Sequence, residues 1–451
     1  MLSAISLSIY EYRKYLVLSL VISLIAIPLA DILVIQRDRN RNEMYGEAFW
    51  IYGFDIYQMN DTVLVELIDE IHPEWNFDDG EHTLPDYLTN VNYEYPIFGL
   101  FFFAIATLIF PEAGGLQQLW LNFILVLVFN LNLVLLAILL RDKIKTEFWA
   151  RMFFGGYFIY GLIMSAGGGK LEPLVDCLLL ISIVLWKEKQ HGKAMFALGL
   201  GVQTKIYPVV VFPVFFLGNP VSSIWFVLSL VVTVIPTFFG ASFDSLFAHI
   251  FNTSDYSSYI VNPLYPGLAI GTPEFATDPV TFHTWFPALI PLVIYAFFML
   301  YTIRAYLPAK SDFEGKSLRL KILELKPFYL YLLPGVLFVF RWVMPWYLYW
   351  LGIVVVLFDK DKHAIGYMKQ ITVVGLLFAF GILCNWPYFI AYPLPDFLEH
   401  FPLQWWITLM GLFLIGFLTA AAYKIWKWQY ERIERRSAIN REAEARGELI
   451  I

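Results

Sequence analysis

The sequence predicts an all-α protein that crosses a membrane many times. Hydrophobic residues make up 59% of its 451 residues and charged residues 15%, whereas soluble domains carry about 25% charged residues. One transmembrane helix requires about 20 apolar residues, so this chain has enough for about a dozen helices. The same composition excludes disordered, collagen-like, disulfide-rich and cytosolic proteins, and the two cysteines, Cys177 and Cys384, both lie inside apolar runs.

Long apolar runs define the expected helices in order along the chain. The first run follows Arg13 and Lys14 and lacks a small-residue cleavage signal, so it is expected to be a retained signal anchor. A Lys-Ile-Tyr-Pro segment at 205–208 interrupts one pair of runs. The expected spans are 14–35, 117–140, 148–166, 171–187, 193–206, 207–218, 221–240, 285–305, 327–341, 343–358, 370–390 and 405–427.

The distribution of lysine and arginine predicts how these spans are oriented. Hardly any basic residues occur near 167–170 or in 241–284 and 391–404, whereas they cluster in 141–151, 187–193, 310–326 and the tail from Lys424. The positive-inside rule places such clusters in the cytoplasm. Both termini then lie in the cytoplasm as well, provided that the short apolar run 96–110 lies along the outer surface as an interfacial helix.

The expected organisation is therefore one membrane domain, 1–427, followed by a cytoplasmic tail, 428–451. Its extracytoplasmic loops are 36–116 and 241–284. The part of the first loop between residues 36 and 95 has fourteen Asp and Glu residues and only three arginines, at positions 37, 39 and 41. A long translocated loop can carry those arginines across the membrane.

Asp55 is the candidate catalytic residue in this acidic loop. It lies in a Gly-Phe-Asp-Ile-Tyr segment, directly before an amphipathic stretch at 56–71. A carboxylate in this position is either a general base that deprotonates an acceptor hydroxyl or the N-cap of the following helix. Asp61, Asp86 and Glu94 are further carboxylates of the loop, and the sequence does not separate them from Asp55.

Three charged residues surround the outer end of the predicted span 171–187. They are Lys170, which ends a Gly-Gly-Gly-Lys turn, Glu172 and Asp176. A charged side chain in the membrane costs about 2.5–3.5 kcal/mol, so Asp176, about 9 Å below the helix end, is expected to line a water-filled cavity. The alternative is an internal ion pair of Lys170 with either carboxylate, which would only order the helix end.

Two further cations, Lys205 and Arg341, are expected at the same outer face. Together with Lys170 they could stabilise a leaving phosphate, because positioned positive charge stabilises developing negative charge. The alternative for each is a side chain that extends to the membrane interface. The sequence contains no HExxH, Walker-type, GxSxG or paired-cysteine motif, and no basic face suited to nucleic acid.

These motifs together resemble the C-type (GT-C) membrane glycosyltransferases, above all glycosyltransferase family 87 and the catalytic subunits of GPI mannosyltransferases. The resemblance lies in Gly-x-Asp-x-Tyr at 53–57, Tyr-x-Tyr-Pro at 93–96, the segment 169–213, and 341–350. The last of these ends in Tyr-Leu-Tyr-Trp and is similar to the late Gln-Tyr-x-x-Trp of the family. Two departures are Tyr-Pro-Ile-Phe at 95–98 in place of Tyr-Pro-Pro-Leu, and Lys170 in place of Gln or Asn.

The resemblance implies an inverting transfer of mannose or another hexose from a polyprenyl or dolichyl phosphate to a lipid or glycan. The reaction would take place at the extracytoplasmic face of a prokaryotic plasma membrane, with the donor, the acceptor and membrane lipids as partners and no nucleic acid. The leaving phosphate already carries charge, so no metal or cofactor is expected. The implied roles are catalysis by Asp55, donor-phosphate binding by Lys205, Arg341 and Lys170, and substrate binding by Glu94, Tyr95, Glu172, Asp176, Tyr207 and Tyr347.

Two other functions remain open at this point. A transporter or flippase for lipid-linked or polar substrates could use the same intramembrane charges. Such proteins often contain two related halves with interrupted helices at matching positions, and this chain has one clear Lys-Ile-Tyr-Pro break and no internal repeat, which favours the enzyme. A non-catalytic subunit of a membrane complex is the third possibility.

Overall fold

The computed structural model contains only helices among the residues it describes, so the all-α prediction is confirmed for this part of the chain. The described residues are 2–33, 37–60, 63–64, 66, 93, 95–109, 115–144, 147–239, 296, 300, 314–334, 347–384, 427 and 431. The elements within them are α1 (Leu2–Leu33), α2 (Arg37–Tyr52), η1 (Gly53–Tyr57), α4 (Ile97–Ile109), α5 (Gly115–Ile144), α6 (Phe148–Leu162), η4 (Ile163–Gly167), α7 (Glu172–Lys187), α8 (His191–Thr204), η5 (Tyr207–Val211), α9 (Phe212–Gly218), η6 (Pro220–Ser222), α10 (Ser223–Val234), η7 (Ile235–Phe239), α14 (Leu318–Glu324), α15 (Lys326–Leu332), α16 (Tyr347–Trp350), η11 (Gly352–Leu357) and α17 (Asp361–Cys384).

Two helices of the described part are long and apolar enough to cross a membrane. These segments are Arg13–Ala30 in α1 and Trp120–Leu140 in α5. The two helices pack against each other through small polar side chains, which commonly join membrane helices. The Ser19 hydroxyl donates to Asn130 Oδ1 at 2.7 Å, and Asn130 Nδ2 donates to Ser23 Oγ at 3.3 Å. Most of the predicted spans at 285–305 and 405–427 lie outside the described residues.

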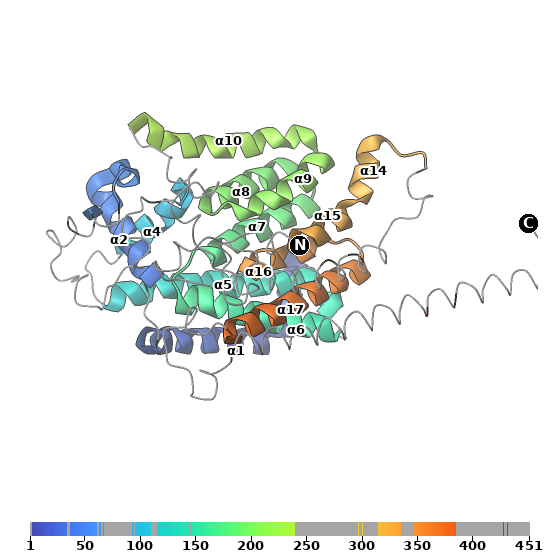
Figure 1. Ribbon diagram of the computed structural model, residues 1–451, viewed down its shortest axis with the longest axis horizontal. Helices are drawn as coiled ribbons and strands as arrows, with labels where there is room; N and C mark the ends of the chain where they lie inside the picture. Colours follow the sequence, from blue (N-terminus) through green and yellow to red (C-terminus); the bar gives the residue numbers. More distant parts are fainter. Residues whose placement is uncertain are drawn as a thin grey trace, which may run out of the picture.

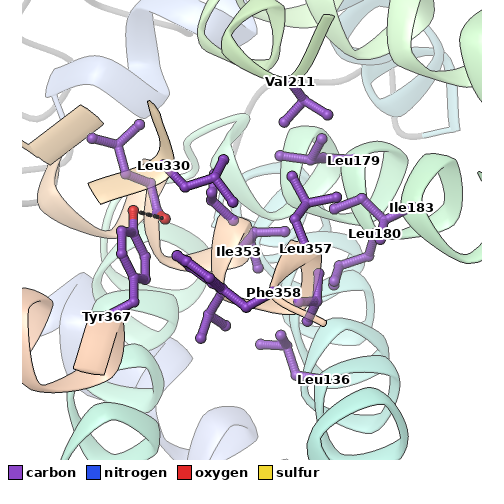
Figure 2. Packing of buried hydrophobic residues seen from close by; sticks show 14 of the residues in the cluster. Leu136, Leu179, Leu180, Ile183, Val211, Leu330, Ile353, Leu357, Phe358 and Tyr367 are labelled. Carbon is purple, nitrogen blue, oxygen red and sulfur yellow. Dashed lines mark hydrogen bonds between the residues drawn. The ribbon is translucent and has the colours of Figure 1, made fainter. Parts of the chain in front are cut away.

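The main core forms where α5, α6, α7, α8, α15, η11 and α17 meet. Figure 2 shows Leu136 of α5, Leu179 of α7 and Ile353 of η11 in one packed cluster, although these segments are far apart in the sequence. All three side chains are fully buried. Tyr367 of α17 closes one side of this core, and its hydroxyl donates to the Leu351 carbonyl oxygen at 2.8 Å (Figure 2). The core therefore joins the two helices around the break at 205–208 to the C-terminal helices.

Two segments rich in basic residues, the hairpin 187–193 and the segment around α14, lie at one end of the helix bundle. The end of α9 lies beside both. Arg319 of α14 donates hydrogen bonds to the carbonyl oxygens of Leu217 and Gly218, at the end of α9. A Cβ added at Gly218 would overlap the ring of Trp186, the residue before the hairpin 187–193. In Figure 1, α14 lies at the right of the bundle and α2 and α4 lie at the left. The predicted outer loop and these basic segments are thus at opposite ends.

The hairpin between α7 and α8 turns at Lys189, which has a φ of 60°. Its backbone N–H donates to the Trp186 carbonyl at 3.0 Å, and the N–H of Gln190 donates to the Leu185 carbonyl at 2.9 Å. This pair of bonds is a Schellman motif, in which the left-handed residue is usually glycine. Lysine at this position is strained because its Cβ crowds the backbone.

We expect Lys189→Gly to raise the free energy of unfolding by about 0.5–1 kcal/mol, since glycine adopts this conformation without strain. Thermal unfolding in detergent measures the change. Lys187→Gly is the control, because Lys187 is helical and glycine there should destabilise α7 by about 1 kcal/mol. A loss of stability in both variants would contradict the role of backbone strain at Lys189.

The first-loop helix α2 packs closely on α4 through Gly46. A Cβ added at Gly46 would lie 2.8 Å from both the carbonyl carbon and the oxygen of Phe103, and backbone atoms cannot move aside as a flexible side chain does. One turn farther on, Trp50 Nε1 donates to the Ala104 carbonyl at 2.7 Å. The start of α4 in turn contacts the N-cap of α7 and the end of α8, because a Cβ at Gly99 would lie 2.9 Å from Leu171 Cδ1 and 3.1 Å from the Thr204 carbonyl oxygen.

Gly46→Ala is therefore expected to lower the free energy of unfolding by about 1–3 kcal/mol, the usual cost of overpacking. Gly155→Ala is the matched control, since Gly155 is also helical and a Cβ there meets nothing within 4 Å. Alanine should stabilise α6 at that position by up to about 1 kcal/mol. Thermal unfolding of both variants compares the two effects directly, and equal stabilisation would contradict the close α2–α4 contact.

Candidate functional site

The Gly-rich turn that precedes α7 is held in one conformation by its neighbours. Gly169 has a φ of 55°, a conformation that favours glycine. A Cβ added there would lie 2.8 Å from Arg39 Cγ. Asn122 Nδ2 donates to the Ala166 carbonyl at 2.8 Å, and the Lys170 N–H donates to the Met164 carbonyl at 2.9 Å. The turn thus fixes the direction in which α7 begins.

Glu172 lies in the first turn of α7 and forms an ion pair with Lys205. The carboxylate is fully buried, the Lys205 side chain is 16% exposed, and Lys205 Nζ lies 2.8 Å from Glu172 Oε1. Lys205 has an extended backbone where α8 ends, because Pro208 cannot continue the helix. The partner of Glu172 is therefore Lys205, at the end of the next helix, α8. The predicted ion pair between Lys170 and Glu172 is wrong.

Aromatic rings surround this ion pair. Lys205 Nζ lies 4.8 Å from the centroid of the Trp350 ring and 5.4 Å from that of Tyr95. Trp350 Nε1 also donates to Glu172 Oε1 at 3.3 Å. The Tyr207 ring stacks on Trp350 at 4.8 Å and 9°. We call these five residues, Lys205, Glu172, Trp350, Tyr95 and Tyr207, the Lys205 cluster.

Tyr347 borders the cluster, with its ring centroid 3.6 Å from that of Trp350. It begins the helical turn α16, which carries both side chains. Tyr349 of the same turn rests on α6, because its hydroxyl occupies the space that a Cβ at Gly156 would fill. Trp350 is therefore positioned from both sides, by α6 through Tyr349 and by η5 through Tyr207.

Asp176 is a structural support of the cluster, and the expectation that it lines a water-filled cavity is wrong. Its side chain is fully buried. The Tyr207 hydroxyl donates to Oδ1 at 2.6 Å and the Tyr157 hydroxyl donates to Oδ2 at 2.8 Å. Buried carboxylates require such partners, and here they come from α6 and η5. Asp176 consequently holds the Tyr207 ring against Trp350.

Asp55 is exposed within the 3-10 helix η1, next to the buried side chain of Tyr57. Asp55 lies inside η1, whose N-cap is Tyr52, and residues 58–60 are not helical, so the interpretation of Asp55 as the N-cap of a helix that begins at residue 56 is wrong. Burial raises the pKa of Tyr57 above its ordinary value of 10.0, which keeps its hydroxyl protonated. That hydroxyl donates to the Tyr95 carbonyl at 3.1 Å, and the Tyr95 ring contacts Lys205. Tyr57 thus connects η1, the helix that contains Asp55, to the Lys205 cluster.

Two residues that the sequence did not predict as site residues lie at this site. Trp350 ends the Tyr-Leu-Tyr-Trp motif and contacts three members of the cluster. Arg39 is one of the three arginines of the acidic loop, and its side chain is 3% exposed and packs against Gly169. A spacing signal was present, because Arg39, Asn42 and Glu43 share one helical face and all are buried. Arg341 and Glu94 lie outside the described residues.

The geometry provides a partly exposed cation between two aromatic rings, beside the N-terminus of α7. Lys170 is half-buried at the same helix end. Positive charge and the helix N-terminus both favour an anion, and aromatic rings suit the apolar face of a sugar. The described residues include no group of three or more His, Cys, Asp or Glu side chains that could hold a metal ion.

Comparison with known proteins provides no relative from which to transfer a function. No family model matches the chain, and neither a curated protein nor a solved structure matches it. The function is therefore inferred from the Lys205 cluster, from the exposed carboxylate of Asp55, and from the motifs of the sequence.

Proposed function

We propose that this protein is an inverting membrane glycosyltransferase that moves a sugar from a polyprenyl or dolichyl phosphate to a lipid or glycan. The observation that carries the proposal is the position of Lys205. Its ammonium group is held by a buried carboxylate and two aromatic rings, yet part of the side chain remains exposed. A fixed cation with an open side suits a phosphate whose charge increases during the reaction.

In the proposed reaction, the carboxylate of Asp55 takes the proton from the acceptor hydroxyl. The hydroxyl oxygen forms a bond to the anomeric carbon while the bond from that carbon to the phosphate oxygen breaks. The polyprenyl phosphate leaves with the electron pair, and Lys205, Arg341 and Lys170 balance its additional negative charge. Attack on the face opposite the phosphate inverts the anomeric configuration. Exposure of Asp55 and its connection to Tyr95 through Tyr57 support this assignment.

The proposal includes about twelve membrane spans, with cytoplasmic termini and an extracytoplasmic active site. Two observations support this orientation. The segments 187–193 and 314–326, which carry seven of the basic side chains that predict the cytoplasmic face, are at the end of the bundle beside Gly218 and Arg319. The helices α2 and α4, which belong to the predicted outer loop, lie at the other end (Figure 1).

Purified protein in lipid nanodiscs with synthetic polyprenyl-phosphate sugars tests the function. We expect release of polyprenyl phosphate and formation of a product with the opposite anomeric configuration, using a panel of hexoses and glycolipid acceptors. The same protein in sealed vesicles tests the transporter alternative. Movement of the lipid-linked sugar between leaflets without any release of polyprenyl phosphate would contradict the proposed enzyme.

A further inference from the structure

The two oxygens of the Glu172 carboxylate have different surroundings. Oε1 accepts hydrogen bonds from Lys205 Nζ at 2.8 Å and from Trp350 Nε1 at 3.3 Å. Oε2 is buried and has no hydrogen-bond partner among the described residues. A buried charged oxygen without a donor is unfavourable, and native structures contain few such atoms. Oε2 belongs to the same carboxylate as Oε1, which contacts the partly exposed Lys205, so a ligand bound to this lysine would lie close to Oε2.

We propose that Glu172 determines sugar specificity by accepting, at Oε2, a hydrogen bond from a ring hydroxyl of the donor sugar. This inference rests on the proposed function. Lys205 would contact the phosphate of the same donor molecule, and the phosphate and the ring hydroxyls of a glycosyl phosphate are only a few bonds apart. The Lys205 side chain is 16% exposed, so the phosphate can approach its ammonium group from that side while the ion pair with Glu172 Oε1 is kept.

A hydroxyl fits this position better than a cation or an anion. Lys205 already neutralises the charge of Glu172, so a cation has little to gain there. A phosphate oxygen would be repelled by the carboxylate. A hydroxyl group donates its proton to Oε2 and brings no charge into the buried site. Protein sites that hydrogen-bond a substrate hydroxyl discriminate strongly against analogues without it, because their own polar atom is then left unpaired.

Glu172→Gln tests whether the protein atom at the Oε2 position must accept a hydrogen bond, because it replaces this acceptor with a donor. Lys205 and Trp350 both donate to Oε1, so the amide oxygen of glutamine must occupy that place. The amide NH₂ group then takes the place of Oε2, where it can only donate a hydrogen bond. The variant therefore reverses the polarity of one atom while it retains the shape of the side chain and its contact with Lys205.

The experiment measures competitive binding of polyprenyl-phosphate sugars in which each ring hydroxyl in turn is replaced by hydrogen or fluorine. In the unaltered protein we expect one position at which both replacements weaken binding by about 100-fold or more. Fluorine should be the worse of the two, because it is an acceptor facing a carboxylate. In Glu172→Gln the fluorine analogue should bind better than the deoxy analogue at that same position.

Asp176→Asn is the matched control, one turn along α7. Both oxygens of Asp176 already accept hydrogen bonds from tyrosines, so this variant should change the affinity for all analogues by the same factor. A uniform change in Glu172→Gln as well would overturn the inference. So would an unaltered protein in which no single hydroxyl replacement costs more than a few-fold in affinity, and this result requires no folded variant.

The outcomes separate this inference from the proposed function. If the unaltered protein neither binds nor transfers any polyprenyl-phosphate sugar, the proposed function fails and the inference fails with it. If transfer occurs but the fluorine and deoxy analogues keep the same order in Glu172→Gln, only the role of Glu172 is wrong.

Discussion

Replacement of Asp55 by asparagine is expected to lower the turnover number for sugar transfer by about 100- to 10,000-fold, the usual contribution of a general base. The amide has nearly the shape of the carboxylate but cannot accept the proton of the acceptor hydroxyl. Asp55 is exposed in η1, so folding should be little affected. Initial rates with a polyprenyl-phosphate sugar in nanodiscs, together with thermal unfolding of the same samples, measure both quantities.

Glu66→Gln is the matched control for this experiment. Glu66 is another exposed carboxylate of the first loop, and the same amide replacement there should leave turnover near that of the unaltered chain. Binding of the donor should also persist in Asp55→Asn, because the phosphate contacts belong to other residues. Unchanged turnover in Asp55→Asn would show that a different carboxylate is the base, and equal losses in both variants would indicate a general effect of loop charge.

The sequence predicted helix α7 and the break near Lys205 because these depend on local signals. Apolar runs matched α7, and Pro208 marks where α8 cannot continue. The partner of Glu172 could not be predicted in the same way. Lys170 is two residues away in the sequence, but the observed partner, Lys205, is on the next helix, and this pairing depends on how α7 and α8 pack.

Asp176 illustrates a second limit of the sequence. A carboxylate in an apolar run indicates function when it is considered alone, because its burial is costly. The structure offsets that cost with hydroxyl groups of Tyr157 and Tyr207, which are 19 and 31 residues away in the sequence. No periodicity or local motif connects these three residues. Their convergence becomes visible only when the helices are assembled.

The helix α2 shows the opposite case, in which a helix forms with little apolar signal. Its residues are mostly polar and belong to the acidic loop, so they lack the apolar periodicity that predicts a helix. Arg39 and Glu43 are nevertheless buried, and Gly46 provides the close contact with α4. Small and polar residues at helical spacing mark this face, whereas apolar residues at helical spacing do not.

Lys205→Met is expected to destabilise the protein by about 3–5 kcal/mol and to abolish measurable transfer. Methionine leaves Glu172 fully buried without its ion-pair partner. An intact buried ion pair adds little net stability, but removal of one partner is costly because the other charge stays buried and unpaired. Glu172→Met should cost less, because the partly exposed Lys205 can turn its ammonium group toward water. Chemical unfolding of both variants measures this asymmetry, and equal costs would contradict it.

The double variant Lys205→Met with Glu172→Met separates stability from function. Removal of both charges leaves no buried ion, so the double variant should recover most of the stability lost in Lys205→Met, to within about 1–2 kcal/mol of the unaltered chain. Transfer should not recover, because the cation proposed to balance the leaving phosphate is still missing. A stable double variant that regains turnover would mean that Lys205 only compensates Glu172. A stable variant that remains inactive and binds the donor weakly is the result expected if Lys205 contacts the donor phosphate.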